Sequence, residues 1–388
     1  MHHSRLLRRL LRKGRCQFWR RNQKAAILQL PLDILVLITD NLALHDKFLL
    51  SHTCKALRQV LLQEWDIELP QLSFEHQIGF WVGLAYTLPS RWVCLKCCKL
   101  HPIDTSDVPA AFMLIKYGAV RTVPCSLESS RGIEVEQYSV QHYHIQLALK
   151  LSRLGNVYQQ YLAALMQTFT HTRTKYSLTP PLTEFYAAEP RIINRRFILR
   201  EEWKISNNTN TALPLFPDQL GCSIPVCPHM RITMGGLVGS RNWKESSINV
   251  IVHWCNIMSP HEGSILLKEV TLLEDSIELA YESPGQWIFN SCLHCSTDLA
   301  VMISTDERKA TIRAWHDFGI EGSPLDASWK AHVRDENRAN WLYVGPYVDY
   351  THGSIRELWS EHVSHGTGTS HAKLRSIFTK LIDGWSEV

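Results

Sequence analysis

The 388-residue sequence has no run of 18 or more apolar residues, and its first residues lack the apolar core and small-residue cleavage site of a secretory signal. A membrane-spanning helix needs about 20 consecutive, mainly apolar residues, and a signal peptide needs an apolar stretch of about 7–15 residues. The first absence argues against a membrane-spanning protein, and the second argues against a secreted one. We therefore expect a protein of the cytoplasm or the nucleus that has no membrane partner.

The sequence also lacks the GxSxG, Walker A, GxGxxG, EF-hand and HExxH motifs, each of which places reactive or ligand-binding groups at a fixed spacing. Two partial matches, His261-Glu262 and Gly366-Thr367-Gly368, are too short to form such a site. We expect no enzymatic activity. An enzyme would need side chains that converge only in three dimensions, and the candidates are His142, His144, His229, His253 and His294.

Cysteine occurs eleven times, an odd number, and two pairs of cysteines have the spacing CxxC. Disulfides are rare in reducing compartments, whereas CxxC is a spacing of metal ligands. The cysteines therefore favour a metal site or buried structural thiols over a disulfide framework.

Basic residues are concentrated in the first 24 positions, which contain nine Arg or Lys and no acid, although the net charge of the whole chain is only +4. We expect residues 1–24 to form a disordered, solvated tail. A nuclear-localisation or nucleic-acid-binding patch, a transit peptide and a surface helix on anionic lipid are the alternatives. Nucleic acid is expected as a partner only through this tail.

Residues 30–58 join a short, nearly all-apolar helix to a Cys-Lys-x-Leu-Arg ending. Pro31 suits the first turn of a helix, Asp33 complements the helix dipole, and the helix is predicted to run to about Asn41. Asp46 is predicted to be the N-cap of a second helix. An apolar helix in so short a segment must be covered by the rest of the chain or by another protein.

The order of residues in this segment resembles the F-box. The matching positions are Leu30, Pro31, Asp33, Ile34, Leu35, Ile38, Leu42, Asp46, Leu49, Cys54, Lys55, Leu57 and Arg58. The F-box is a three-helix module that docks on a Skp-type adaptor in cullin-based ubiquitin ligases, so the resemblance implies an adaptor and a cullin as partners. The adaptor contacts that it implies are Leu30, Pro31, Ile34, Leu35, Ile38, Leu42, Leu49 and Leu57.

From about Leu182 apolar and polar residues alternate with period two, which is typical of strands. Residues 183–206 are predicted to form two strands around a turn at Asn194-Arg195, with Phe197, Leu199, Trp203 and Ile205 on one face. Further strands are predicted at 231–237, 247–254, 264–273, 275–282, 285–290, 298–304 and 309–319. A long amphipathic helix is predicted over about 138–168, and a terminal helix from about Gly353.

These elements predict an α+β fold with an N-terminal three-helix F-box-like module, then helices packed on a mainly antiparallel β body with a C-terminal helix. The predicted domains are a basic tail (1–24), the F-box-like module (25–68), a linker with a CxxC pair (69–119) and a target-recognition body (120–388). The body resembles one group of fungal F-box proteins. The residues that carry this likeness are Cys94-x-x-Cys97, His101-Pro102, Cys227-Pro-His229 and Cys292-x-x-Cys295.

The late CxxC pair is the better candidate for a metal site. Zinc takes four Cys or His ligands in a tetrahedron, and a CxxC turn supplies two of them. Cys292 and Cys295 are predicted to bind structural zinc together with Cys227 and His229. Buried thiols without metal are the alternative.

The early pair, Cys94 and Cys97, could be completed by Cys125 together with Cys98, His101 or Glu128. The resemblance to fungal F-box proteins implies a second CxxC where this chain has Cys125-Ser-Leu-Glu128, so this departure weakens the prediction of an early site. A single site formed by both CxxC pairs would span a far longer gap than usual.

We expect a subunit that docks on a Skp-type adaptor and recruits an unknown protein target to a ubiquitin ligase. The alternatives are an F-box protein without ligase activity, a zinc-stabilised interaction protein and, more remotely, a metalloenzyme.

Overall fold

The computed structural model describes residues 26–61, 64–111, 134–135, 138–155, 157–175, 181–207, 215, 224, 226–230, 273, 275–333 and 348–366. Several predicted features lie outside these residues: the basic tail, the strands at 231–237 and 247–254, residues 264–272 of the strand at 264–273, Cys125, Glu128 and His253. The chain divides into two compact units, Met1–Pro102 and Ile103–Val388, which are called unit 1 and unit 2 below.

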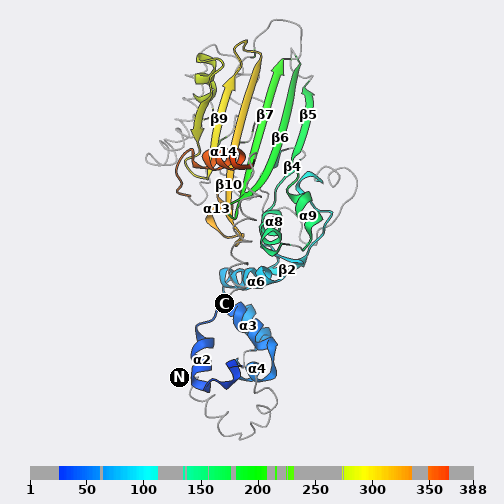
Figure 1. Cartoon of the computed structure of the whole chain (residues 1–388), viewed down its shortest axis with the longest axis vertical. Helices are drawn as coiled ribbons and strands as arrows, with labels where there is room; N and C mark the ends of the chain where they lie inside the picture. Colours follow the sequence, from blue (N-terminus) through cyan, green and yellow to red (C-terminus); the bar gives the residue numbers. More distant parts are fainter. Residues whose placement is uncertain are drawn as a thin grey trace, which may run out of the picture. The chain divides into compact units, whose positions relative to one another are not determined.

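Unit 1 begins with short helices and ends with a β-hairpin (Figure 1). Its elements are η2 (Ala26–Gln29), α2 (Leu32–Asp40), α3 (Leu44–Thr53), α4 (Lys55–Leu61), α5 (Trp65–Glu68), η3 (Leu69–Gln71), α6 (Phe74–Thr87), β1 (Arg91–Cys94) and β2 (Lys99–Pro102). The predicted start of the first helix agrees with the structure, in which Pro31 is the N-cap of α2. Asp46 lies inside the first turn of α3, so its prediction as an N-cap was wrong: Ala43 holds that position.

The segment predicted to be a linker forms the 14-residue helix α6 and the hairpin β1–β2, both within unit 1. Ser73 caps α6, because its hydroxyl accepts a hydrogen bond from the His76 amide, a common way to satisfy a helix start. The Phe80 ring on α6 packs against Phe48 on α3 and Trp65 on α5, with ring centroids 5.5 and 6.0 Å apart. The helix therefore completes the core of unit 1.

Unit 2 is built on a six-stranded antiparallel sheet with the order β5-β6-β7-β10-β9-β8 (Figure 1). The strands are β5 (Phe169–Lys175), β6 (Leu182–Ile193), β7 (Arg196–Asn207), β8 (Ile288–Ser291), β9 (Thr297–Ile303) and β10 (Lys309–Ile320). Asn194 and Arg195 both have left-handed backbone angles, as a two-residue hairpin turn requires. This turn and the strands around it confirm the sequence prediction.

The two faces of the sheet have different cover. On one face, Ile198 and Trp315 pack against Ile355 and Trp359 of α14 (Ser354–Gly366), which crosses the strands in Figure 1. Side chains alternate along a strand, and Phe318 is three residues from Trp315 on β10. Phe318 therefore lies on the opposite face of the sheet. There Phe318 packs against Trp329 of α13 (Ala327–Lys330), with ring centroids 5.8 Å apart.

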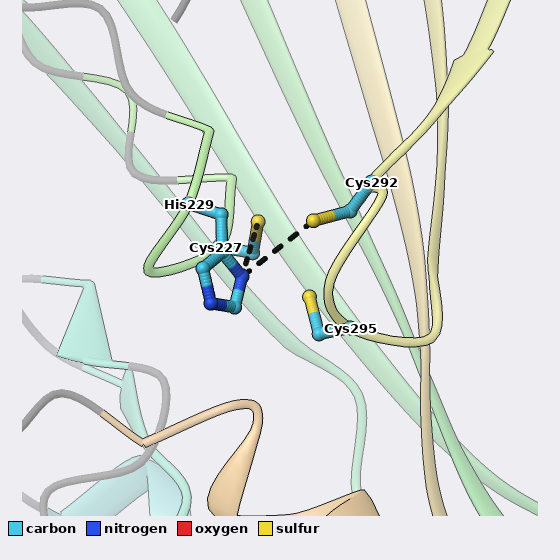
Figure 2. Close-up of side chains that lie close together, drawn as sticks. All are labelled: Cys227, His229, Cys292 and Cys295. Carbon is cyan, nitrogen blue, oxygen red and sulfur yellow. Dashed lines mark hydrogen bonds between the residues drawn. The ribbon is translucent and has the colours of Figure 1, made fainter. Parts of the chain in front are cut away.

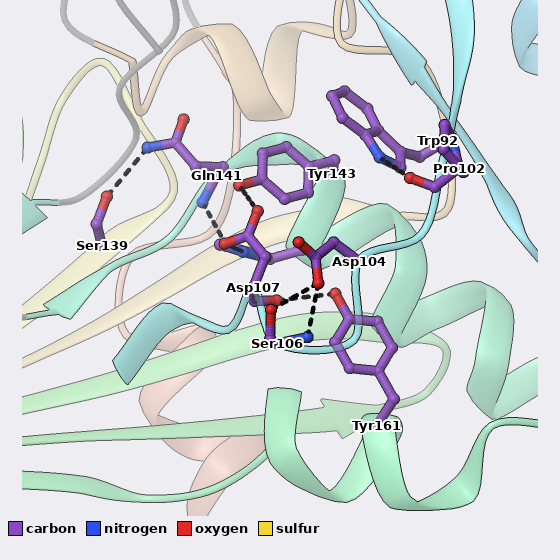
Figure 3. A network of polar contacts seen from close by, with 10 residues as sticks. Trp92, Pro102, Asp104, Ser106, Asp107, Ser139, Gln141, Tyr143 and Tyr161 are labelled. Atoms are coloured by element: carbon purple, nitrogen blue, oxygen red, sulfur yellow. Dashed lines mark hydrogen bonds and ion pairs between the residues drawn. The ribbon is translucent and has the colours of Figure 1, made fainter. Parts of the chain in front are cut away.

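Helices α8 (His142–Leu154) and α9 (Gln159–Leu165) replace the single long helix predicted over about 138–168. Gly155 has a left-handed φ of 74° and ends α8 at the predicted break. The other short elements of unit 2 are η4 (Pro109–Ala111), β3 (Glu134–Val135) and β4 (Tyr138–Ser139). The segment before η4 is tied to both helices, because Tyr143 and Tyr161 donate hydrogen bonds to Asp107 over 2.7 and 2.9 Å (Figure 3).

Residues 275–282 are helical, so the strand predicted there was wrong. The buried residues of this region are Leu273, Ser276, Ile277 and Ala280. Their spacing of three and four residues is that of a helix face. The segment is short and apolar, and such a segment fits a strand and a helix equally well in the sequence. The α+β class with an antiparallel sheet is confirmed. Across the described ranges, no helix combines the length and apolar character needed to cross a membrane.

Candidate functional site

Two short loops of unit 2 bring four predicted metal ligands together. Cys227 and His229 lie in a tight turn in which the amides of Val226 and Cys227 both donate to the Met230 carbonyl. Cys292 and Cys295 lie in the connection between β8 and β9. The Cys292 amide donates to the carbonyl of Thr297 over 2.8 Å and closes this second loop.

The four ligand atoms form one compact cluster (Figure 2), which we call the body cluster: Cys227, His229, Cys292 and Cys295. All four atoms lie within 4.8 Å of one another. His229 Nδ1 is 3.5 Å from the Cys292 sulfur and 4.0 Å from the Cys227 sulfur. Tetrahedral zinc, with bonds of about 2.3 Å to sulfur and about 2.0 Å to nitrogen, separates its ligands by about 3.5–3.8 Å. The body cluster could therefore hold a metal ion.

Backbone amides already point at two of these sulfurs. The Met230 amide donates to Cys227 Sγ over 3.3 Å, and the His294 amide donates to Cys292 Sγ over 3.4 Å. Hydrogen bonds to a thiolate favour the charged form that binds metal. The two loops thus present their sulfurs in a polar setting although the cysteines are buried.

The thiols of the body cluster compete for ionisation. Burial, followed by the neighbouring thiols, raises the pKa of Cys227 and Cys295 well above the usual range. Burial opposes ionisation of Cys292 too, but hydrogen bonds from the other two thiols and from His229 outweigh it and bring the pKa of Cys292 well below the usual range. One thiolate is therefore favoured in the metal-free cluster. A divalent cation is what would allow all three to ionise together.

A buried chain of polar contacts leads from the body cluster into the sheet. The Thr297 hydroxyl lies 3.2 Å from Cys295 Sγ and 3.0 Å from His316 Nδ1. His316 Nε2 lies 2.9 Å from a carboxylate oxygen of Glu201, whose other oxygen accepts a hydrogen bond from the Tyr186 hydroxyl. Thr297, His316 and Glu201 are completely buried. Contacts around metal ligands fix the orientation of those ligands. This series of polar contacts could therefore orient the Cys295 side chain.

A second, smaller cluster lies in unit 1, where Cys94, Cys97 and His101 place their ligand atoms within 4.8 Å of one another. Cys125, which the sequence also assigned to this site, lies outside the described residues. His101 was one of three residues that could have completed the pair. The structure brings His101 next to Cys97.

The residues that the F-box resemblance assigned to adaptor contact separate by burial. Pro31, Ile34 and Ile38 are exposed, and Leu30, Leu42 and Leu49 are half-buried. Leu35 and Leu57 are buried inside unit 1 and are not part of its surface. The sequence reasoning missed Leu37, which is the most exposed apolar residue of α2 at 61%. A helical wheel places Leu37 beside Ile34 and Ile38, so the signal was present in the sequence.

The four described histidines that were considered for catalysis lie in two separate places. His142 and His144 lie at the start of α8, where the His142 ring contacts Trp329 and His144 takes part in a capping box with Gln141. His229 and His294 contact each other at the body cluster, with ring centroids 5.0 Å apart.

Comparison with known proteins gives no relative: no family model, no curated protein and no solved structure matches this chain. The likeness to the F-box therefore rests on the residues of the segment 30–58 alone.

Proposed function

We propose that this protein is a non-enzymatic docking subunit that binds a Skp-type adaptor through α2 and recruits a protein target with unit 2. The observation that carries the proposal is the exposed apolar side of α2. Ile34, Leu37 and Ile38 are 40%, 61% and 38% exposed, whereas Leu35 and Thr39 on the other side of the helix are buried. Contiguous exposed apolar side chains mark interaction surfaces.

The arrangement of helices supports the same proposal. Three short helices, α2, α3 and α4, follow one another over residues 32–61, as the F-box resemblance implies. Cys54 has an extended backbone that separates α3 from α4, and Leu57 packs inward from α4. Docking through such a module would place this chain in a cullin-based ubiquitin ligase, where the partners perform the chemistry.

We propose structural zinc as the metal of the body cluster. Three cysteines and one histidine supply a complete tetrahedral set, which is the donor set of structural zinc sites. A catalytic zinc site keeps one position for water or substrate, and four protein ligands fill that position. The closed donor set disfavours a catalytic role for a metal ion in the body cluster.

The docking proposal is tested with the double variant Ile34→Asp with Ile38→Asp. We expect this variant to lose at least about 100-fold in affinity for a purified Skp-type adaptor, because two apolar contacts become charged and each central contact of an interface contributes about 2 kcal/mol. Circular dichroism should show an unchanged fold, since both side chains are exposed. Isothermal titration calorimetry measures the affinity.

The matched control is Ile320→Asp, which changes an exposed isoleucine of unit 2 that is 62% exposed. Its affinity for the adaptor should equal that of the unchanged protein. Unchanged binding by the Ile34, Ile38 variant would refute docking through α2. A separate co-purification of the tagged protein with its partners distinguishes the two kinds of F-box protein. Recovery of cullin with the adaptor would support a ligase subunit, and recovery of the adaptor alone would favour an F-box protein outside the ligase.

A further inference from the structure

The hairpin at the end of unit 1 brings together three potential metal ligands from a stretch of eight residues. Cys94 ends β1, Cys97 lies in the turn, and His101 lies on β2. The Cys97 sulfur is 3.1 Å from His101 Nε2, and the three ligand atoms all lie within 4.8 Å of one another. Cys94 is buried, and the other two are half-buried.

Strand pairing explains why these residues meet. Trp92 pairs with His101 and Cys94 pairs with Lys99. Because directly paired residues lie on the same face and side chains alternate along each strand, Trp92, Cys94 and His101 share one face of the hairpin. The turn over residues 95–98 then carries Cys97 back toward that face.

The turn adopts a backbone conformation that its sequence does not favour. Cys98 has a left-handed φ of 50°, although this region costs a residue with a Cβ atom about 1 kcal/mol or more. Such strained positions persist where the surrounding structure fixes them, often at ligand-binding sites. Here the left-handed residue allows the chain to reverse immediately after Cys97.

His101 is held in place by its neighbours. Its ring stacks on Trp92, with ring centroids 4.9 Å apart and an interplanar angle of 29°. Trp92 Nε1 in turn donates a hydrogen bond of 3.2 Å to the Pro102 carbonyl (Figure 3). A ring held in a fixed orientation is prepared to bind a metal ion.

We propose that Cys94, Cys97 and His101 bind a zinc ion, which forms a second metal centre in unit 1 in addition to the body cluster. Two thiolates and one imidazole are the ligands of known zinc sites with three protein donors, and water or a further side chain takes the fourth position. We call this set of three residues the hairpin cluster.

The hairpin cluster would brace the unit that carries the docking helices. The hairpin packs on α6, and α6 packs on α3. A metal ion that ties β1 to β2 therefore stabilises the surface on which α6 and α3 rest. This consequence, unlike the metal site itself, rests on the proposed docking function.

Cysteine alkylation of the unchanged full-length protein tests the site without any substitution. Cys97 and Cys98 are adjacent and both half-buried, but only Cys97 belongs to the hairpin cluster. After zinc loading, native alkylation followed by peptide mapping should show Cys94 and Cys97 protected and Cys98 reactive. A chelator should increase the labelling rate of Cys97 at least about 10-fold and leave that of Cys98 nearly unchanged. An equal response of Cys97 and Cys98 would overturn the proposal.

Metal stoichiometry gives the second measurement. The zinc-loaded chain should contain two ions, one for each cluster, and the variant Cys94→Ser with Cys97→Ser should contain one. The control Cys98→Ser should keep both. A single ion in the unchanged protein that survives in the Cys94, Cys97 variant would also overturn the proposal. If the adaptor binds while the hairpin takes no zinc, the docking function stands and the second metal centre falls.

Discussion

Helix α2 of unit 1 and the sheet of unit 2 depart in opposite ways from the usual placement of apolar and polar side chains. Unit 1 exposes apolar side chains, with Leu37 of α2 61% exposed. Unit 2 buries polar and ionisable side chains: Glu201 and His316, for example, lie in the sheet with no exposed surface. Burying a charged group costs several kcal/mol unless a partner is present. The buried polar groups of unit 2 have partners within the chain, whereas the proposed partner of the exposed side of α2 is another protein.

Asp298 is a second example of an internal partner in unit 2. Its side chain is fully buried on β9. One carboxylate oxygen accepts from the Gly353 amide over 2.8 Å, and the other accepts from the amides of Ile355 and Arg356 over 3.0 Å each. A carboxylate at this place satisfies the free amides at the start of α14 and complements the helix dipole. Within the described part of the chain, no comparable internal partner covers Ile34 and Leu37, which are exposed.

The largest expected effect follows removal of metal from unit 2. Cys292→Ser, or a strong chelator, should abolish zinc binding at the body cluster and destabilise unit 2 by up to about 10 kcal/mol, because binding energy of that size is typical of structural zinc. Thermal unfolding followed by tryptophan fluorescence measures the change. Cys54→Ser, outside both clusters, is the control. Equal unfolding temperatures with and without chelator would contradict the proposal that the body cluster binds a structural metal ion.

Glu201 and Glu202 allow a direct comparison of a buried carboxylate whose partner is also buried with one whose partners are partly exposed. Glu201→Ala should destabilise the protein by about 3–5 kcal/mol, because it leaves His316 buried without its partner. Glu202→Ala should cost only about 1 kcal/mol, since its partners Arg313 and Lys204 are 34% and 50% exposed. Urea unfolding measures both changes. Similar losses for the two variants would contradict this account of the interior of the sheet.

Leu35 and Leu37 make the same comparison on α2. Leu35→Ala should cost about 2–5 kcal/mol, because Leu35 is 1% exposed and its removal leaves a cavity. Leu37→Ala should change the free energy of unfolding by less than about 0.5 kcal/mol. Adaptor binding should respond in the opposite order, with Leu37→Ala weakening it directly. Equal stability costs would mean that Leu37 is covered by this chain itself.

His332 should make unit 2 sensitive to mild acid. Burial, followed by the nearby His316, lowers the pKa of His332 from about 6.5 to about 4. The unfolded state therefore binds a proton that the folded state excludes, so stability is complete above pH 6.5 and falls by up to about 3 kcal/mol as the pH drops toward 4. His332→Gln should reduce this fall, measured by urea unfolding at several pH values. An unchanged pH dependence would contradict the assignment.

Sequence alone predicted the local and periodic features well. The hairpin at Asn194-Arg195 followed from strand alternation on both sides of a turn, and the structure confirms it. The body cluster followed from ligand spacing, because CxxC and CxH each bring two donors together whatever the rest of the fold does. Its assembly from two distant loops was a choice among several pairings.

The features that the sequence did not predict depend on long-range contacts. The contact between Glu201 and His316 joins residues of two neighbouring strands, and nothing in either local segment indicates that they meet. The sequence did not predict α6 or the hairpin β1–β2, because α6 has Gly79 and Gly83 within it and the hairpin is short, so neither gave a strong periodic signal. In the structure α6 packs against α3, and the hairpin packs against α6.

Docking of the exposed side of α2 on a Skp-type adaptor can be measured by mixing the unchanged, zinc-loaded full-length protein with the purified adaptor. Size-exclusion chromatography with light scattering then gives the mass of the eluted species. We expect a stable one-to-one complex. Separate elution of a folded protein and a folded adaptor would contradict it.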